Sequence, residues 1–205
     1  MLPWEHAAIA YVLYSGYSRV RYGRPPDGWA VLVVLFASQL PDLIDKPLAW
    51  QFGLLPSGRS LAHSIFVGVP LSAAAIHLAR KRGRPEQGSA FAIGYLSHLA
   101  TDAVPLYPGA SPNFGSILWP LVGQGQWSHT QGVFFDRITG ILVGNVPSIL
   151  ELEPSLNLLV GLAMVAAMLL IWILDGAPGI RELLTLLVWP IAKLRYVLRR
   201  WRYAL

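Results

Sequence analysis

The residues of this chain best suited to chemistry are histidines and aspartates at the ends of apolar segments. Within residues 94–102, His98 and Asp102 are four positions apart, so on a helix they project from one face, one turn apart. An imidazole and a carboxylate placed in this way can bind one divalent metal ion, or the carboxylate can orient the histidine. An ionisable pair in a lipid-compatible segment is energetically costly and therefore indicates a functional site. The alternative is a pair that satisfies itself inside a helical bundle.

The segments that carry these residues belong to a strongly apolar chain. Of the 205 residues, 54% are hydrophobic and 13% are charged, whereas soluble domains have roughly 25% charged residues. This composition predicts an all-α, polytopic membrane helical bundle that forms a single domain. The absence of cysteine excludes disulfides, thiolate zinc sites and cysteine nucleophiles. The net charge of +5 is distributed as expected for membrane topology, so we expect no nucleic-acid partner.

Five apolar runs are expected to form about five transmembrane helices. They cover residues 7–17, 29–40, 61–78, 89–104 and 156–174, of which the last is the most apolar. A segment at 116–121 is too short to cross and is expected to be re-entrant or interfacial, and residues 133–150 are expected to be interfacial. The domain thus divides into metal-site helices with an outer loop (1–122), an interfacial region (123–155), a last span (156–174) and a basic amphipathic tail (175–205) with Trp189, Trp201 and Tyr203 as interface anchors.

The positive charges predict which membrane face each end occupies. Of the 16 Lys and Arg residues, 13 follow the first run, separate the third run from the fourth, or lie in the tail. The positive-inside rule places all three regions in the cytoplasm, which gives a multi-pass protein of the cell membrane with its N-terminus outside and its C-terminus inside. Six potential metal ligands then meet at the outer face: His6, Asp42, Asp45, His63, His98 and Asp102. Convergence at one depth favours a metal site, because pairs with a structural role would be scattered in depth.

Such a set of ligands suffices for one or two divalent ions, with one carboxylate bridging. Zinc suits imidazole and carboxylate ligands, and manganese and iron are alternatives. Asp42 is our candidate for orienting or deprotonating water. Arg59 is a candidate phosphate ligand, although an anchoring role is equally open, and His129 is a candidate acid or additional ligand. The more distant His77 and Asp175 are interpreted as structural, with Asp175 in a turn and helix cap.

The combination of these motifs resembles the YdjM-like membrane proteins, which are also called LexA-binding, inner-membrane-associated hydrolases. The resemblance depends on His6, Pro41-Asp42-x-x-Asp45, Arg59-x-x-x-His63-Ser64, Gly94-Tyr95-x-Ser97-His98-x-x-x-Asp102 and Leu118-Trp119-Pro120. It covers roughly residues 1–122, and residues 38–47 and 56–64 are most similar to haloarchaeal members. The resemblance implies a metal-dependent hydrolase.

A more distant similarity links the chain to zinc-dependent phospholipases C and single-strand nucleases, which cleave phosphoesters on a zinc cluster. Their order of His, Asp, His and then His-x-x-x-Asp implies that the metal ligands are His6, Asp45, His63, His98 and Asp102. No clear second His-x-x-x-Asp pair is present, so a three-zinc cluster is not implied.

These observations together predict a membrane-bound hydrolase that uses metal-activated water on a lipid or other amphiphilic phosphoester. One alternative is a metal- or proton-coupled transporter, in which we would expect the ligands near the middle of the bilayer. The other alternative is a closed metal site with a structural role. The sequence leaves the choice among them, and the oligomeric state, open.

Overall fold

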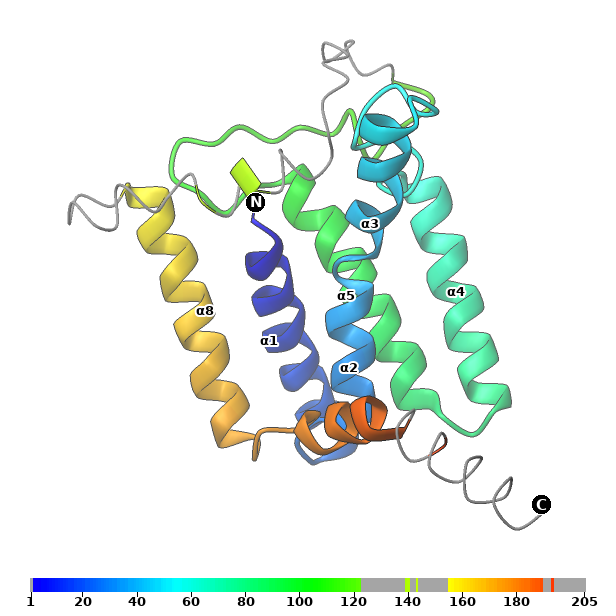
Figure 1. Ribbon diagram of the computed structural model, residues 1–205, viewed down its shortest axis with the longest axis vertical. Helices are drawn as coiled ribbons and strands as arrows, with labels where there is room; N and C mark the ends of the chain where they lie inside the picture. Colours follow the sequence, from blue (N-terminus) through cyan, green and yellow to red (C-terminus); the bar gives the residue numbers. More distant parts are fainter. Residues whose placement is uncertain (1, 123–138, 141–142, 144–154, 190–192, 194–205) are drawn as a thin grey trace, which may run out of the picture.

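The structure, a computed structural model, describes residues 2–122, 139–140, 143, 155–189 and 193. These residues form helices joined by loops, and no strand occurs among them (Figure 1). The helices are α1 (Pro3–Tyr22), α2 (Gly28–Ala37), α3 (Leu40–Lys46), the π-helical turn η1 (Pro47–Gln51), α4 (Ile65–Lys81), α5 (Pro85–Ala103) and α8 (Leu156–Leu174). A further helix covers residues 180–189. The predicted all-α fold is confirmed for this part of the chain.

Short polar residues set the points at which two of these helices begin. The carboxylate of Asp27 accepts a hydrogen bond from the backbone N–H of Trp29 at 3.0 Å, in the first turn of α2. The hydroxyl of Ser64 accepts one from the backbone N–H of Phe66 at 3.2 Å, in the first turn of α4. Both satisfy N–H groups that have no partner within their helix. Helix α1 ends at Gly23, whose φ of 67° lies in the left-handed region that favours glycine.

Helix α5 lies at the centre of the bundle. It packs against α1, α2 and α4, while α8 lies on the opposite side of α1 (Figure 1). The buried core cluster consists mainly of small side chains, namely Ala10, Ala30 and Ala90 with Tyr14 and Val34. Small residues let helix backbones approach closely, as they do between membrane helices.

A side chain at Gly94 would force α2 and α5 apart. A Cβ atom there would lie 2.5 Å from the backbone carbonyl oxygen of Val34 and 3.2 Å from the amide nitrogen of Ser38. We therefore expect Gly94→Ala to lower the free energy of unfolding by about 1–3 kcal/mol, the usual cost of overpacking. The control is Gly16→Ala on α1, where a Cβ atom would meet nothing within 4 Å. Denaturant unfolding in detergent compares the two variants, and equal stabilities would contradict the close contact between α2 and α5.

The prediction of about five membrane spans is supported only in part. Helices occur at all five apolar runs, but among the described residues two stretches are long and apolar enough to cross a membrane: Gly28–Gln51 and Leu156–Leu174. Helix α4 has 17 residues, and α1 and α5 bury polar side chains such as His6 and His98. The polar residues that form the bundle interior thus reduce the apolar character by which a span is recognised.

The loops at the end of the bundle near the N-terminus differ in detail from the expectation. The third apolar run, expected from residue 61, becomes helical at Ile65. Residues 116–121 form turns that pack on the start of α4. There the Ile65 N–H donates to the Ile117 carbonyl at 2.9 Å, and the Ser64 hydroxyl donates to the Trp119 carbonyl at 2.5 Å. Most of the predicted interfacial region at 133–150, together with His129, Trp201 and Tyr203, lies outside the described residues.

A buried aspartate joins the end of α8 to α1. One carboxylate oxygen of Asp175 accepts hydrogen bonds from the hydroxyls of Tyr11 at 2.7 Å and Ser15 at 2.6 Å. Arg19 forms an ion pair with the other oxygen. The predicted turn at Asp175 is correct, because α8 ends there, but the sequence did not reveal its contacts with α1.

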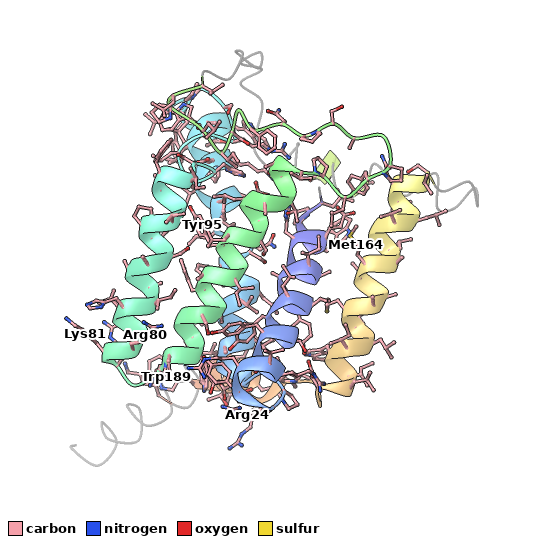
Figure 2. All side chains as sticks on the ribbon, turned by 180° about the vertical axis from the view of Figure 1, so that it is seen from behind. Arg24, Arg80, Lys81, Tyr95, Met164 and Trp189 are labelled. Atoms are coloured by element: carbon pink, nitrogen blue, oxygen red, sulfur yellow. The ribbon has the colours of Figure 1, made fainter. Side chains whose placement is uncertain are left out.

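The helix at 180–189, orange in Figure 1, crosses the end of the bundle opposite the N-terminus. Figure 2 shows Trp189 at this end, together with Arg24, Arg80 and Lys81. The apolar side chains of the helix at 180–189 are exposed, among them Leu183, Leu184, Leu187, Val188 and Trp189. An exposed apolar surface beside a group of cations is typical of a helix at a membrane interface.

Candidate metal centre

Five of the six predicted metal ligands meet at the end of the bundle that carries the N-terminus. His6 lies in the second turn of α1, Asp42 in α3, His63 in the loop before α4, and His98 and Asp102 in the last turns of α5. All five are buried, with His63 and His98 at 0% exposure. They form two overlapping groups whose potential ligand atoms lie within 4.8 Å of one another: His6, His98 and Asp102, and Asp42, His63 and His98. The structure thus brings five of the six predicted residues together.

Hydrogen bonds fix the ring orientation of His63 and His98. Nδ1 of His63 lies 2.8 Å from a carboxylate oxygen of Asp45, and Nδ1 of His98 lies 2.6 Å from the carbonyl oxygen of Ser38. Both partners are acceptors, so Nδ1 of each ring carries the proton. In each neutral ring, Nε2 is therefore left with a lone pair, which is the arrangement of a histidine that binds a metal.

His6 has the same arrangement through a threonine. Its Nδ1 lies 3.0 Å from Oγ1 of Thr101, and the Thr101 hydroxyl donates to the carbonyl of Ser97 at 2.9 Å. The Thr101 oxygen thus accepts from Nδ1 of His6, which leaves a lone pair on Nε2. The ring of His6 also stacks on that of His98, with centroids 4.0 Å apart.

The Nε2 atoms of the three histidines converge with two carboxylates. Those of His63 and His98 are 3.2 Å apart. Oδ1 of Asp42 lies 3.4 Å from Nε2 of His63, and Oδ1 of Asp102 lies 3.4 Å from Nε2 of His6. Two facing lone pairs at this separation repel each other unless a proton or a cation lies between them.

A buried carboxylate oxygen of Asp42 lies beside Nε2 of His63. Oδ1 of Asp42 is buried and accepts no hydrogen bond from the described residues, a costly state for a charged oxygen. Imidazole nitrogens and carboxylate oxygens are ligands for zinc, manganese and iron. These residues therefore fit a divalent metal ion.

The carboxylates favour positive charge even without an ion. Burial by itself lowers the pKa of His63, but its contacts with Asp102, Asp42 and Asp45 outweigh burial and raise the pKa to about 10. A proton on His63 and a metal ion thus satisfy the same electrostatic demand.

Asp45 lies behind His63 and does not reach the point shared by the Nε2 atoms. One of its oxygens lies close to both Nδ1 of His63 and the backbone N–H of Ser60, each at 2.8 Å. The other accepts from the backbone N–H of Ala62 at 2.8 Å. With both oxygens engaged and 0% exposure, Asp45 orients His63 and fixes its loop. The sequence predicted a direct ligand, since the spacing to Asp42 does not reveal which carboxylate the loop binds.

The break between α2 and α3 supplies the acceptor for His98. Pro41, which lacks an N–H, lies in the first turn of α3, where its missing donor costs nothing. The chain changes helix at Ser38 and Gln39, and the Ser38 carbonyl there accepts from His98.

Two cations flank the cluster. Arg59 pairs with both oxygens of Asp102, through Nε at 3.1 Å and Nη2 at 3.3 Å, and its side chain is 44% exposed. Lys46 pairs with Asp42 at 2.5 Å. Arg59 was expected here from the sequence, whereas Lys46 was not, although its i,i+4 spacing from Asp42 on a helix indicates this pair.

The remaining predicted candidates do not join the cluster. His77 is exposed and lies towards the other end of α4, as expected for a residue outside the site. His129 lies outside the described residues, so its predicted role stays a prediction.

A known protein family matches most of the chain. The family of YdjM inner membrane proteins matches residues 1–178. The match thus extends beyond the motifs at 1–122 and includes α8. No curated protein and no solved structure matches the chain at a significant level. With all the metal-centre residues inside the matched region, the chain belongs to the YdjM family of inner membrane proteins.

Proposed function

We propose that this protein is a membrane-bound metal-dependent hydrolase with one divalent ion in its metal centre. The observation that carries the proposal is the convergence of three histidines and two buried carboxylates in two overlapping groups that share His98. His98 belongs to both potential ligand groups, and its single Nε2 lone pair can bind one ion at a time, because Nδ1 is engaged by Ser38. This favours one ion over two. Zinc is the first candidate, with manganese and iron as alternatives.

The proposed reaction is hydrolysis of a phosphoester, such as a lipid headgroup. A bound divalent ion supplies Lewis acidity and lowers the pKa of water towards about 7. Asp42 accepts the proton of the attacking water, since Oδ1 faces the shared point while Oδ2 is held by Lys46. The water oxygen adds to phosphorus, the P–O bond to the alcohol breaks, and the proton passes to the departing alcohol oxygen. Arg59 stabilises the charge on the phosphoryl oxygens.

The half-exposed Arg59 favours catalysis over a structural metal site, because it connects the buried cluster with the surface. The transport alternative is less well supported. Transport sites lie near the middle of the bilayer on broken helices, whereas here His6, His98 and Asp102 lie near the ends of α1 and α5.

The proposal is tested by measuring whether the metal-loaded protein hydrolyses phospholipids and an aryl phosphodiester. We expect Asp42→Asn to lower turnover by about 10²–10⁴-fold, the usual contribution of a general base. The control is Asp27→Asn, because asparagine also caps a helix. A wild-type protein that retains its metal but hydrolyses none of these substrates would contradict phosphoester hydrolysis and favour a structural metal site.

The proposed topology has the N-terminus and the metal centre outside and the C-terminus in the cytoplasm. Single cysteines in this cysteine-free chain test it at three exposed positions. We expect Gln51→Cys and Ser111→Cys, at the metal-centre end, to react with an impermeant thiol reagent on intact cells. Arg82→Cys, in the basic turn between α4 and α5, should react only after lysis. The reverse pattern would place the metal centre in the cytoplasm.

A further inference from the structure

The two cations of the metal centre each pair with a different carboxylate of the cluster. Lys46 contacts Oδ2 of Asp42, whose Oδ1 is 3.4 Å from Nε2 of His63. Arg59 contacts Oδ2 of Asp102, which is 3.5 Å from the same nitrogen. A single carboxylate group therefore lies between each cation and Nε2 of His63.

The side chain of Trp50 packs against both segments that carry these cations. Nζ of Lys46 lies 5.8 Å from the ring centroid of Trp50. A Cβ atom at Gly58 would lie 3.0 Å from the Trp50 indole, so the turn that carries Arg59 packs on this ring. Trp50 thus contacts Lys46 and the residue next to Arg59, so the two segments that carry these cations pack against the same side chain.

Arg59 retains donors for another anion. Its contact with Asp102 uses Nε and Nη2, and a guanidinium has five N–H donors in all. The side chain of Arg59 is 44% exposed, whereas that of Asp102 is 2% exposed. Because the carboxylate is buried and the guanidinium reaches the surface, Arg59 has further donors that an anion arriving from outside could contact. They match the geometry of a phosphoryl group.

The charge balance links anion binding to metal binding. Without a metal ion, the positive charges of Lys46 and Arg59 are paired with the carboxylates of Asp42 and Asp102, so little net positive charge remains to attract an anion. A divalent ion held by the histidines and Asp102 would add two positive charges beside Lys46 and Arg59, which would favour the binding of an anion there. From these contacts, and resting on the proposed function, we infer that Lys46 and Arg59 form a binding site for a phosphate-type oxyanion that is completed by the metal.

Binding of inorganic phosphate to the purified full-length protein tests this site without relying on turnover. Metal-loaded protein should bind phosphate at least tenfold more tightly than protein stripped by chelator. Lys46→Met should weaken binding by about 10–100-fold, the usual range for a charge-assisted hydrogen bond, while Lys46→Arg should retain most of it. The control is Lys81→Met, at the opposite end of the bundle (Figure 2). Metal content is measured for every variant.

A competition experiment distinguishes a lipid headgroup from a soluble phosphoester as the natural ligand. Nanodiscs that contain phosphatidic acid should displace phosphate more effectively than glycerol phosphate if the ligand is a lipid headgroup, and equally well if it is a soluble phosphoester.

Two results would overturn the inference. One is unchanged phosphate affinity in a metal-loaded Lys46→Met protein, or in Arg59→Met if Lys46→Met does not fold. The other is a metal-loaded wild-type protein that binds no phosphate. In that case, hydrolysis of an uncharged ester would still show that the protein is a metal-dependent hydrolase. Phosphate binding without any hydrolysis would instead support the anion site and contradict the proposed function.

Discussion

Replacing Asp45 with alanine is expected to lower the free energy of unfolding by about 3–5 kcal/mol and also to abolish metal binding. The Asp45 carboxylate is completely buried and accepts from the backbone N–H groups of Ser60 and Ala62 as well as contacting Nδ1 of His63. Without it, these buried donors have lost their acceptor, and each such loss costs about 1–3 kcal/mol. His63 also loses the group that orients its ring. Denaturant unfolding and elemental analysis measure the two effects.

The matched control for this prediction is Leu43→Ala on the same helix. Leu43 is 52% exposed, so in detergent we expect a change within about 0.5 kcal/mol and an unchanged metal content. If Asp45→Ala matches wild type in both measurements, Asp45 does not hold the loop that presents His63.

The second large effect concerns His98. Structural zinc sites contribute about 10–16 kcal/mol through four ligands, so the loss of one ligand is expected to weaken metal binding by about 10²–10³-fold. His98 is the residue shared by both potential ligand groups, which makes His98→Ala the most damaging single histidine substitution. Competition with a chromogenic chelator measures the affinity.

His77→Ala controls for the removal of a histidine from the chain. His77 is exposed on α4, away from the cluster, so this variant should retain the affinity of the wild-type protein. Equal losses in the two variants would show that the metal is bound somewhere other than at the converging Nε2 atoms.

Local features of the sequence were sufficient to predict most helices. Residues 156–174 were expected as the most apolar span, and α8 has the same bounds. The number of spans was overestimated, since the helices that supply His6, His98 and Asp102 direct polar side chains inward and are less apolar than a lipid-exposed span.

The membership of the metal centre could be predicted from topology, but the roles of its residues could not. The alternating directions of successive helices bring their ends to one side of the bundle, which is sufficient to group His6, His63 and His98 (Figure 1). The difference between Asp42, which faces the shared point, and Asp45, which binds a loop, depends on how residues 57–63 fold. That loop conformation is a tertiary feature without a local sequence signal.

X-ray absorption spectroscopy of purified protein that has never been exposed to chelator tests the central claim most directly. We predict one transition-metal ion per chain, with zinc as the first candidate and a spectrum that shows scattering from three imidazole rings together with carboxylate oxygen. His98→Ala should reduce the imidazole contribution or remove the metal. The absence of any transition metal, or a bound metal whose spectrum lacks imidazole scattering, would contradict the metal centre.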